Sequence, residues 1–278
     1  MTAAEVFAPA KVNLTLHVVG RLPNGYHDLD SLVVFADIGD RLEVALSDRP
    51  SLQVTGPMAK GVPDDESNIV MRAMALIGVN ARIVLHKYLP NAAGLGGGSS
   101  DAAAALRALS DLSGLAVPAN LQQLGADVPV CLAAQAARMR GIGDRVDLLP
   151  VMPPLHAVLV NPNVAVPTGK VFSELESPSN PAMPDGWPAW HSAADVIGFL
   201  RGMRNDLEAP AMAAQPVIAQ VLGALHVTSG CQLARMSGSG ATCFGLYSDL
   251  ETAASAAGRL REAFPGWWVA ATRLNAVS

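Results

Sequence analysis

The chain has 278 residues, of which 50% are hydrophobic and 15% are charged, with a formal net charge of −5 at pH 7. This length accommodates one large or two ordinary domains with a sizeable core. The absence of a basic excess argues against a nucleic-acid partner. Residues 1–14 lack the basic start and apolar run of a signal peptide, and no apolar run reaches the roughly 18 residues of a membrane span. The sequence therefore predicts a cytoplasmic protein with neither nucleic-acid nor membrane partners.

Cysteine and histidine usage gives no sign of a metal site. Cys131, Cys231 and Cys243 are odd in number and widely spaced, which fits neither a disulfide framework nor a zinc site. The six histidines show no metal-ligand spacing. We therefore assign no metal-ligating residue and expect a reducing compartment.

The first predicted strand covers residues 10–19, where apolar and polar residues alternate. Lys11 and Asn13 share its polar face, so a cation and an amide lie side by side; an ordinary solvated face is the alternative. A Pro-Asn-Gly turn follows and leads to Tyr26 and His27. These two rings either cap the core or form a stacking shelf for a flat base.

The first half continues as strands and short helices. Strands are predicted at residues 32–38, 41–46, 52–55 and 80–89, and helices at 68–77, from about 102 to 113, and at 118–124. The longest of these helices begins directly after a glycine-rich loop.

That loop, Pro90–Ser100, is the most informative stretch of the sequence. Four glycines and two serines lead into a run of alanines, which has strong helix propensity. A glycine-rich loop before a helix offers unpaired N–H groups and the positive end of the helix dipole, a geometry that binds phosphate. A flexible loop with a serine cap is the alternative. The spacing excludes both a Walker A loop and a dinucleotide-binding fingerprint.

The loop resembles the central ATP-binding motif of the GHMP kinases. Lys11-Val-Asn13 followed by Gly25-Tyr-His27 sharpens the resemblance to the branch of that superfamily that phosphorylates 4-diphosphocytidyl-2-C-methyl-D-erythritol. The match continues at Gly125–Pro129, at Pro167-Thr168 with Phe172, and at Ser237–Ala241. These motifs occur in the family's order and span most of the chain.

The resemblance implies a set of site residues. It assigns ATP binding to the whole loop: Pro90, Asn91, Ala92, Ala93, Gly94, Leu95, Gly96, Gly97, Gly98, Ser99 and Ser100. It places Asn68 and Lys87 near the adenine, and the acceptor substrate against Asn13, Tyr26, His27, Thr168 and Phe172. Tyr26 and Phe172 would flank the cytosine, and His27 would read its polar edge. Ser237–Ala241 would close on the phosphates.

Asp127 is the candidate general base. It lies in an apolar context, where a carboxylate is costly to bury unless it is paired, and Lys11 is the obvious partner. Such a pair keeps the carboxylate ionised and helps to deprotonate a hydroxyl. The resemblance gives both positions the same catalytic roles. A turn or helix-cap aspartate is the alternative.

Two intervals are shorter than the family's pattern, between Asn68 and Lys87 and between Ser100 and Asp127. Either the chain is naturally trimmed at these places or it lacks residues there. Asn68 and Lys87, the residues placed near the adenine, are the two ends of the first interval.

The second half begins after a buried strand predicted at residues 155–160. Helices are predicted at 168–175, 193–203, 208–225 and 250–264, and strands at 231–236, 242–247 and 267–273. A proline-rich loop lies between the first two helices. We expect an ATP-binding domain over residues 1–160 and a C-terminal domain over 161–278.

The resemblance implies an α+β fold of two domains, the first like domain 2 of ribosomal protein S5 and the second ferredoxin-like. It implies ATP as co-substrate, Mg²⁺ as the phosphate counter-ion and transfer to the 2-hydroxyl of a cytidine diphosphate sugar alcohol in non-mevalonate isoprenoid biosynthesis. The sequence leaves the oligomeric state open between monomer and homodimer. Another GHMP kinase, such as homoserine kinase, is one alternative. An inactive nucleotide-binding module is the other, although Lys11 and Asp127 are both present.

Overall fold

The computed structural model describes residues 3–275. Contacts divide the chain into two units, each built from several segments. The first unit comprises Met1–Lys11, Ile38–Asn91 and Gly96–Ala134, and the second comprises Val12–Asp37, Ala92–Leu95 and Gln135–Ser278. The domain boundary near residue 160 stays a prediction, because these units are defined by contacts and are discontinuous in sequence.

The first unit contains a sheet of four strands. These are β1 (Ala3–Asn13), the C-terminal half of β3 (His27–Leu46), β4 (Ser51–Thr55) and β5 (Ala81–His86). Strand β3 pairs antiparallel with β5, and β5 pairs parallel with β4. A Cβ at Gly39 would lie 2.1 Å from the carbonyl oxygen of Ala8. Glycine is therefore required where β1 and β3 approach.

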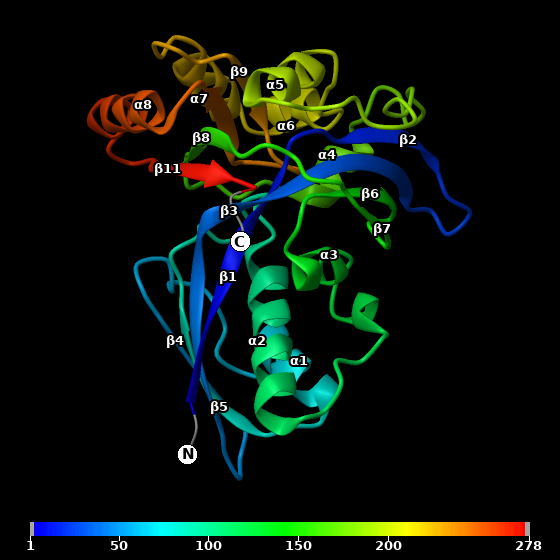
Figure 1. Ribbon diagram of the computed structural model, residues 1–278, viewed down its shortest axis with the longest axis vertical. Coiled ribbons are helices and arrows are strands. Elements are labelled where there is room, and N and C mark those ends of the chain that lie inside the picture. The colour runs from blue at the N-terminus through cyan, green and yellow to red at the C-terminus, as the bar shows by residue number, and fades with distance from the viewer. Residues whose placement is uncertain (1–2, 276–278) are drawn as a thin grey trace. The chain divides into compact units, whose positions relative to one another are not determined.

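Helices α1 (Ile69–Ile77) and α2 (Gly97–Ser113) of this unit lie side by side, and α3 (Val128–Ala133) packs on α2 (Figure 1). The alanines of α2 are almost completely buried, because a small side chain lets the helix approach its neighbours closely. Gly114 ends the helix with φ of 74°, the left-handed conformation that glycine adopts at helix ends.

The short interval after Asn68 forms a complete helix, turn and strand. Gly78 closes α1 with φ of 74° and donates back into the last helical turn, and β5 begins at Ala81. A left-handed glycine reverses the chain within a few residues. The interval therefore needs no further residues to join these elements.

The second unit contains two groups of strands. In the first, β2 (His17–Arg21) and β6 (Ala137–Gly141) pair with the N-terminal half of β3, and β7 (Arg145–Leu148) pairs with β6. The sequence pattern did not predict β6 or β7, which are short and interrupted by charged residues.

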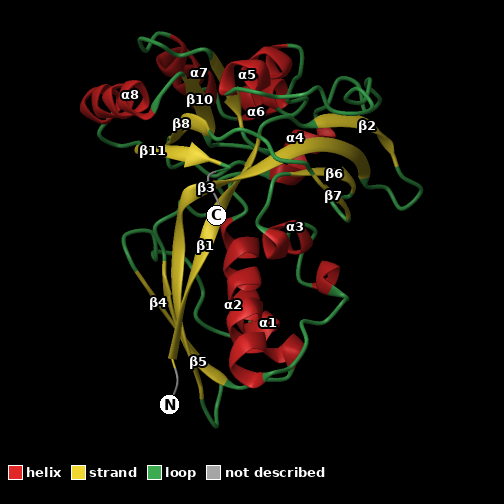
Figure 2. Ribbon diagram, viewed as in Figure 1, coloured by secondary structure: helices red, strands yellow, loops and turns green. Residues whose placement is uncertain are grey.

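The other group is an antiparallel sheet with the order β11-β8-β10-β9. Its strands are β8 (Leu155–Asn161), β9 (Leu233–Met236), β10 (Cys243–Tyr247) and β11 (Trp268–Leu274). Helices α7 (Val217–His226) and α8 (Leu250–Ala263) cover one face (Figure 2) and share its core. This order and the alternation of strands and helices make the sheet ferredoxin-like, as the resemblance implied.

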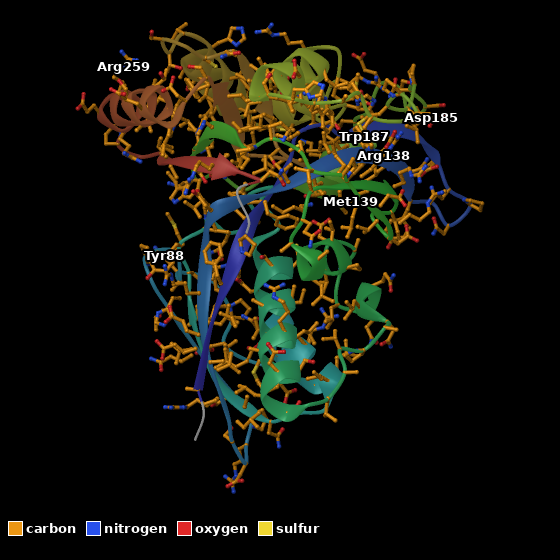
Figure 3. The ribbon with its side chains drawn as sticks, viewed as in Figure 1. Tyr88, Arg138, Met139, Asp185, Trp187 and Arg259 are labelled. Carbon is orange, nitrogen blue, oxygen red and sulfur yellow. The ribbon has the colours of Figure 1, made fainter. Side chains whose placement is uncertain are left out.

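Three shorter helices complete the second unit: α4 (Thr168–Ser173), α5 (Ala193–Arg201) and α6 (Glu208–Ala214). The proline-rich loop before α5 is held by the Arg138 guanidinium, which bonds both carboxylate oxygens of Asp30 at 2.7 Å and the backbone carbonyls of Met183 and Pro184. Arg138 also lies over the ring of Trp187 at 5.7 Å (Figure 3). A fully paired guanidinium thus anchors a loop that has no regular structure.

Four sequence predictions differ from the structure. Residues 10–19 form the end of β1 and the start of β2 instead of one strand, and residues 32–46 belong to the single strand β3. Residues 118–124 contain only one 3₁₀ turn, η1 (Leu121–Gln123). The helix predicted over 208–225 is broken before Pro216, because proline cannot donate the hydrogen bond that would continue it.

None of the helices in the described residues is long and apolar enough to cross a membrane.

Candidate active site

In the first unit, the ammonium of Lys11 donates a hydrogen bond of 2.8 Å to Asp127 Oδ2. The contact predicted from the sequence is therefore present. Lys11 is only 4% exposed, which rules out the alternative that it lies on an ordinary solvated face. Asp127 occupies the cap position before α3, yet its side chain makes no capping hydrogen bond. Its carboxylate is directed to Lys11 instead, and about a third of the side chain is exposed.

Gly96 brings the stem of Lys11 to the start of α2. Its φ is +61°, and a Cβ at this position would lie 3.1 Å from both Cβ and Cε of Lys11. Gly96 is the cap residue of α2, with no side-chain capping bond, and the first turn contains no acidic residue. The first N–H groups of α2 therefore remain available to an anion, next to a buried lysine.

A second buried lysine lies beneath the same helix start. Lys87 donates to Asp40 and, at 2.7 Å, to Asp101 Oδ2, while Asp40 Oδ1 accepts from the backbone of Tyr88 and Leu89. Burial raises the pKa of Asp101 to about 7, and the two carboxylates raise the pKa of Lys87 against the effect of its own burial. Asp101 Oδ1 is buried without a hydrogen-bond partner.

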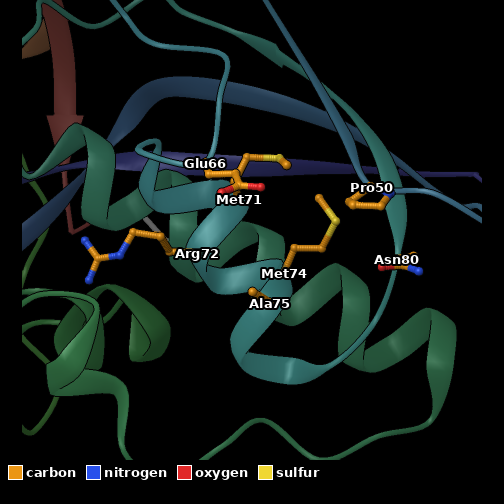
Figure 4. Close-up of a pocket in the computed structure, with 7 residues that line it drawn as sticks. All are labelled: Pro50, Glu66, Met71, Arg72, Met74, Ala75 and Asn80. Carbon is orange, nitrogen blue, oxygen red and sulfur yellow. The ribbon is translucent and has the colours of Figure 1, made fainter.

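The residues predicted near the adenine both have structural partners. Asn68 caps α1 by accepting from Val70 N at 2.8 Å, and its amide donates to Pro63. Lys87 is fully engaged by its two carboxylates. A pocket of about 410 Å³ opens beside α1, lined by Pro50, Glu66, Met71, Arg72, Met74, Ala75 and Asn80 (Figure 4). Neither predicted residue lines it, and their contact with adenine stays a prediction.

Ser237, in the second unit, bonds residues of two other sequence motifs, the central loop and the motif that contains Asn13. Its hydroxyl donates to the carbonyl of Gly94 at 2.8 Å and accepts from the backbone N–H of Asn13 at 3.0 Å. A Cβ at Gly94 would lie 2.3 Å from the carbonyl oxygen of Ser237. The central loop and the turn at Ser237–Ala241 thus cross in backbone contact, which only glycine permits.

Two predicted acceptor-binding residues lie at this crossing. Asn13 is buried, and its amide donates to Ser31 at 2.8 Å. The Thr168 hydroxyl lies 2.9 Å from that of Ser239. The structure therefore brings Asn13 and Thr168 to the same turn, and their substrate contacts stay predictions.

The aromatic residues are only partly brought together. The rings of His27 and Phe172 stack, with centroids 4.9 Å apart and an interplanar angle of 21°, whereas Tyr26 is 64% exposed. Burial, together with the positive charge of Arg21, lowers the pKa of His27. The imidazole is therefore neutral at pH 7 and carries one hydrogen-bond donor and one acceptor.

The two serines of the central loop have different surroundings. Ser100 is buried and donates to the carbonyl of Pro9 at 2.7 Å, while Ser99 is half-buried and has no such bond. Among residues 3–275 no group of three or more His, Cys, Asp or Glu side chains is placed to hold a metal ion.

Comparison with known proteins identifies the family. The model for the GHMP kinases N terminal domain matches residues 68–144, and the model for GHMP kinases C terminal matches residues 192–266. The 4-diphosphocytidyl-2-C-methyl-D-erythritol kinase of Ruegeria pomeroyi is 54% identical over 278 residues, covering 98% of this chain and 99% of that protein. That of Cereibacter sphaeroides is 52% identical over 274 residues, covering 97% and 99%. The chain belongs to the 4-diphosphocytidyl-2-C-methyl-D-erythritol kinase family of the GHMP kinases.

Solved structures agree with this family. A crystal structure of 4-(cytidine 5'-diphospho)-2C-methyl-D-erythritol kinase is 35% identical, with a TM-score of 0.79, covering 99% of this chain and 100% of that chain. Homoserine kinase from Cytophaga hutchinsonii is 20% identical, with a TM-score of 0.69, covering 98% and 95%. The second likeness shows the GHMP kinase fold alone.

Several polar residues of this GHMP kinase escaped the sequence analysis. Asp40 and Asp101 hold Lys87, and Asn205 and Glu208 bond the backbone around Ser237. Asp101 ends the glycine motif, and Asn205 precedes Glu208 by three residues, a spacing typical of a helix start. Those were the only signals available, because the partners are distant in sequence.

Proposed function

We propose that the chain transfers the γ-phosphate of ATP to the 2-hydroxyl of 4-diphosphocytidyl-2-C-methyl-D-erythritol, a step of isoprenoid biosynthesis by the non-mevalonate route. The observation that carries this proposal is the ion pair between buried Lys11 and partly exposed Asp127 beside an uncapped helix start, in a chain about half identical to kinases named for this acceptor.

Asp127 acts as the general base. Its Oδ2 is held by Lys11, and its other carboxylate oxygen accepts the proton of the acceptor hydroxyl. The hydroxyl oxygen then forms a bond to the γ-phosphorus while the bond from that phosphorus to the β,γ-bridging oxygen breaks, releasing ADP. Lys11 stabilises the negative charge that develops on the attacking oxygen.

The start of α2 binds the phosphates of ATP. The first N–H groups of the helix have no partner within the helix, and the helix dipole favours an anion at this end. Gly96, Gly97 and Gly98 have no side chains that would occupy the phosphate volume. Backbone donors in fixed positions stabilise the transferring phosphoryl group without reorganisation.

The acceptor's base is read by the aromatic residues. The neutral His27 offers a donor and an acceptor, which suits the amine and ring nitrogen of cytosine. Phe172 already stacks on His27, and the exposed ring of Tyr26 supplies a further stacking surface. Asn13 and Thr168 contact the rest of the acceptor as hydrogen-bonding groups.

Mg²⁺ would enter with ATP and would be held mainly by the oxygens of the nucleotide. The described residues fit this arrangement, because Mg²⁺ in kinases is commonly held by one or two protein oxygens together with phosphates. Asp127 and the hydroxyl of Ser99, which lies near Gly125, would be the protein oxygens to hold the ion, whereas the Ser100 hydroxyl is engaged by Pro9. The ion would neutralise phosphate charge. A cytoplasmic location, the lack of nucleic-acid and membrane partners, and a monomer or homodimer stay predictions.

A coupled assay of ADP release tests the proposal. The cytidyl acceptor, homoserine and mevalonate are compared at equal concentrations, each with and without enzyme. We expect turnover with the cytidyl acceptor alone, and faster release with homoserine or mevalonate would refute the proposed acceptor.

A further inference from the structure

A buried ion cluster in the first unit has no part in the reaction steps proposed above. It consists of Asp40 on β3, Lys87 directly after β5 and Asp101 on α2. The exposed fraction of each side chain is 4% or less. Because Lys87 precedes the central glycine-rich loop and Asp101 follows it, the cluster joins the two ends of that loop.

Asp40 fixes the chain that enters the loop. Its Oδ1 accepts from the backbone N–H groups of Tyr88 at 2.6 Å and Leu89 at 2.9 Å, the last two residues before the loop. Its Oδ2 accepts from the ammonium of Lys87. The backbone N–H of Lys87 donates to the carbonyl of Thr55 at 2.8 Å. Three consecutive residues are therefore held in place at this end of the loop.

The same ammonium reaches the helix that leaves the loop. Lys87 Nζ donates to Asp101 Oδ2 at 2.7 Å. A Cβ at Gly97, the first residue of α2, would lie 3.6 Å from Lys87 Nζ and 3.7 Å from Asp40 Oδ2, so the cluster lies against the helix start. The first N–H groups of α2 have no partner within the helix. The cluster therefore sets where these free donors lie relative to the strands.

The cluster is neither an anion site nor an obvious source of stability. Two carboxylates surround one ammonium, so it offers no free positive charge to a phosphate. Asp101 Oδ1 is buried without a hydrogen-bond partner, and an unpaired buried oxygen lowers stability. Buried ion pairs often stabilise a fold no more than apolar residues of the same size. The geometry that the cluster imposes on α2 gives a reason for an aspartate at position 101.

We propose that Asp101 is a positioning residue for ATP: by binding the Lys87 ammonium, which Asp40 also binds, it holds the start of α2 where its first N–H groups meet the phosphates. This inference rests on the proposed kinase function, which places the phosphates of ATP at that helix start. Asp101 itself touches no substrate. Backbone donors stabilise a phosphoryl group only when they are held in the right place beforehand.

Asp101→Ala is the direct test, because it cuts the link to α2 and leaves Lys87 paired with Asp40. Asp101→Asn is the conservative variant, since its amide oxygen can still accept from the ammonium. The matched control is Asp111→Ala, the same substitution at an exposed position further along the same helix. Both alanine variants and the asparagine variant remove one negative charge, so charge alone does not distinguish them.

We expect Asp101→Ala to weaken the binding of ATP with Mg²⁺, measured by calorimetry, and to lower kcat/KM for ATP by about 10-fold, because a displaced helix start misplaces its donors. KM for the cytidyl acceptor should stay within about twofold of wild type. Asp101→Asn and Asp111→Ala should keep wild-type ATP affinity. Should Asp101→Ala not fold, Asp40→Asn should show the same loss, because its oxygen still accepts from the backbone but its amide nitrogen cannot accept from the lysine.

Equal ATP affinities for Asp101→Ala and Asp111→Ala would overturn the inference, and so would equal losses in Asp101→Ala and Asp101→Asn. Tighter ATP binding by Asp101→Ala would also overturn it, because the lost negative charge would then matter more than the position of the helix. The calorimetric measurement needs no acceptor, so it separates this inference from the proposed reaction. Wild-type enzyme that binds ATP but does not phosphorylate the cytidyl acceptor would refute the reaction only.

Discussion

The two glycine motifs are built in different ways. Gly96–Ser100 is the start of α2, and its N–H groups are directed by the regular geometry of the helix. Ser237–Ala241 is a tight turn between two strands, with Gly238 and Gly240 at φ of 59° and 87°. Its carbonyls are held by a side chain about thirty residues away in sequence, in the segment that begins at Asn205.

This difference shows where each motif is vulnerable. A helix start needs only its own local sequence, because the helix that follows fixes the backbone. A turn with two left-handed residues has no such frame and depends on side-chain hydrogen bonds and on close backbone packing. We therefore expect substitutions in the first motif to change chemistry and substitutions around the second to change structure as well.

The largest expected effect is on the ion pair beside the helix start. Asp127→Ala and Lys11→Ala should each lower kcat by about 100-fold or more, the usual scale for a positioned acid–base group. In Asp127→Ala the free energy of unfolding should change much less, because Asp127 is partly exposed and makes no capping bond. Stopped-flow kinetics and urea unfolding measure the two quantities, and a kcat within threefold of wild type in either variant would contradict the assignment.

The next largest effect is expected at Gly94, which lies at the crossing with Ser237, in comparison with Gly98, which lies inside α2. Gly94→Ala would place a Cβ 2.3 Å from the Ser237 carbonyl at φ of +73°, so we expect a loss of stability of about 2 kcal/mol or more. Gly98→Ala has its nearest neighbour, Ile69 Cγ2, at 3.6 Å and lies inside a helix, where alanine is preferred by up to about 1 kcal/mol. Thermal unfolding measures both variants.

Equal melting temperatures for the two alanine variants would show that the crossing of the loop and the turn is not tightly packed. That result would also remove the structural reason for the glycine at position 94.

A moderate effect is expected at the aromatic residues. Tyr26→Ala and Phe172→Ala should raise KM for the cytidyl acceptor and leave that for ATP nearly unchanged, since base stacking contributes roughly 1–3 kcal/mol. His27→Ala should also narrow the preference for cytidyl over uridyl analogues, because a site matched to cytosine leaves polar groups unpaired with uracil. An unchanged analogue ratio in competition assays would place base recognition elsewhere.

A separate prediction concerns the pH dependence of stability. The pKa of Asp101 is raised to about 7 by burial, so the folded chain keeps a proton that the unfolded chain releases above pH 4. Wild type should therefore lose stability relative to Asp101→Asn as pH rises from 4.5 to 7, by up to about 1.4 kcal/mol per pH unit. Lys87 stays protonated throughout, since its pKa is raised.

Asp37→Asn provides a control, because the fold lowers the pKa of Asp37 and raises that of Asp101. Burial raises the pKa of Asp37, but hydrogen bonds from Thr272 and Arg273 outweigh it and lower the pKa overall. Its stabilising contribution is complete above pH 4 and is lost as pH falls through the folded-state pKa. The difference between wild type and Asp37→Asn should therefore stay constant from pH 4.5 to 7, and urea titrations that show the same slope for both variants would contradict this assignment of protons.

The sequence predicted the first glycine motif well because its signals are contiguous. Glycines, serines and alanines in one run define a loop and a helix, and the contact between Lys11 and Asp127 followed from the cost of an unpaired carboxylate in an apolar context. The family resemblance predicted the ferredoxin-like class of the sheet in the second unit but gave no order of its strands. The local pattern of apolar residues predicted the strands of this sheet.

The side chains that bond the backbone of the second motif, Ser237–Ala241, could not be predicted in the same way. Asn205 and Glu208 are polar residues near a helix start, and nothing local distinguishes a side chain that caps its own helix from one that bonds a distant turn. The stack of His27 on Phe172 joins residues 145 positions apart, and the pairing of Lys87 with Asp40 and Asp101 is equally non-local. Only the tertiary structure brings these groups together.

The most direct test of the account is to identify the product. ATP and 4-diphosphocytidyl-2-C-methyl-D-erythritol are incubated with wild type and, in parallel, with Asp127→Ala, and both mixtures are followed by ³¹P NMR. The account predicts one new phosphate monoester on the 2-hydroxyl for each ADP formed by wild type, and at least about 100-fold slower formation by the variant. ADP formed without a phosphorylated acceptor, or equal rates for the two proteins, would contradict it.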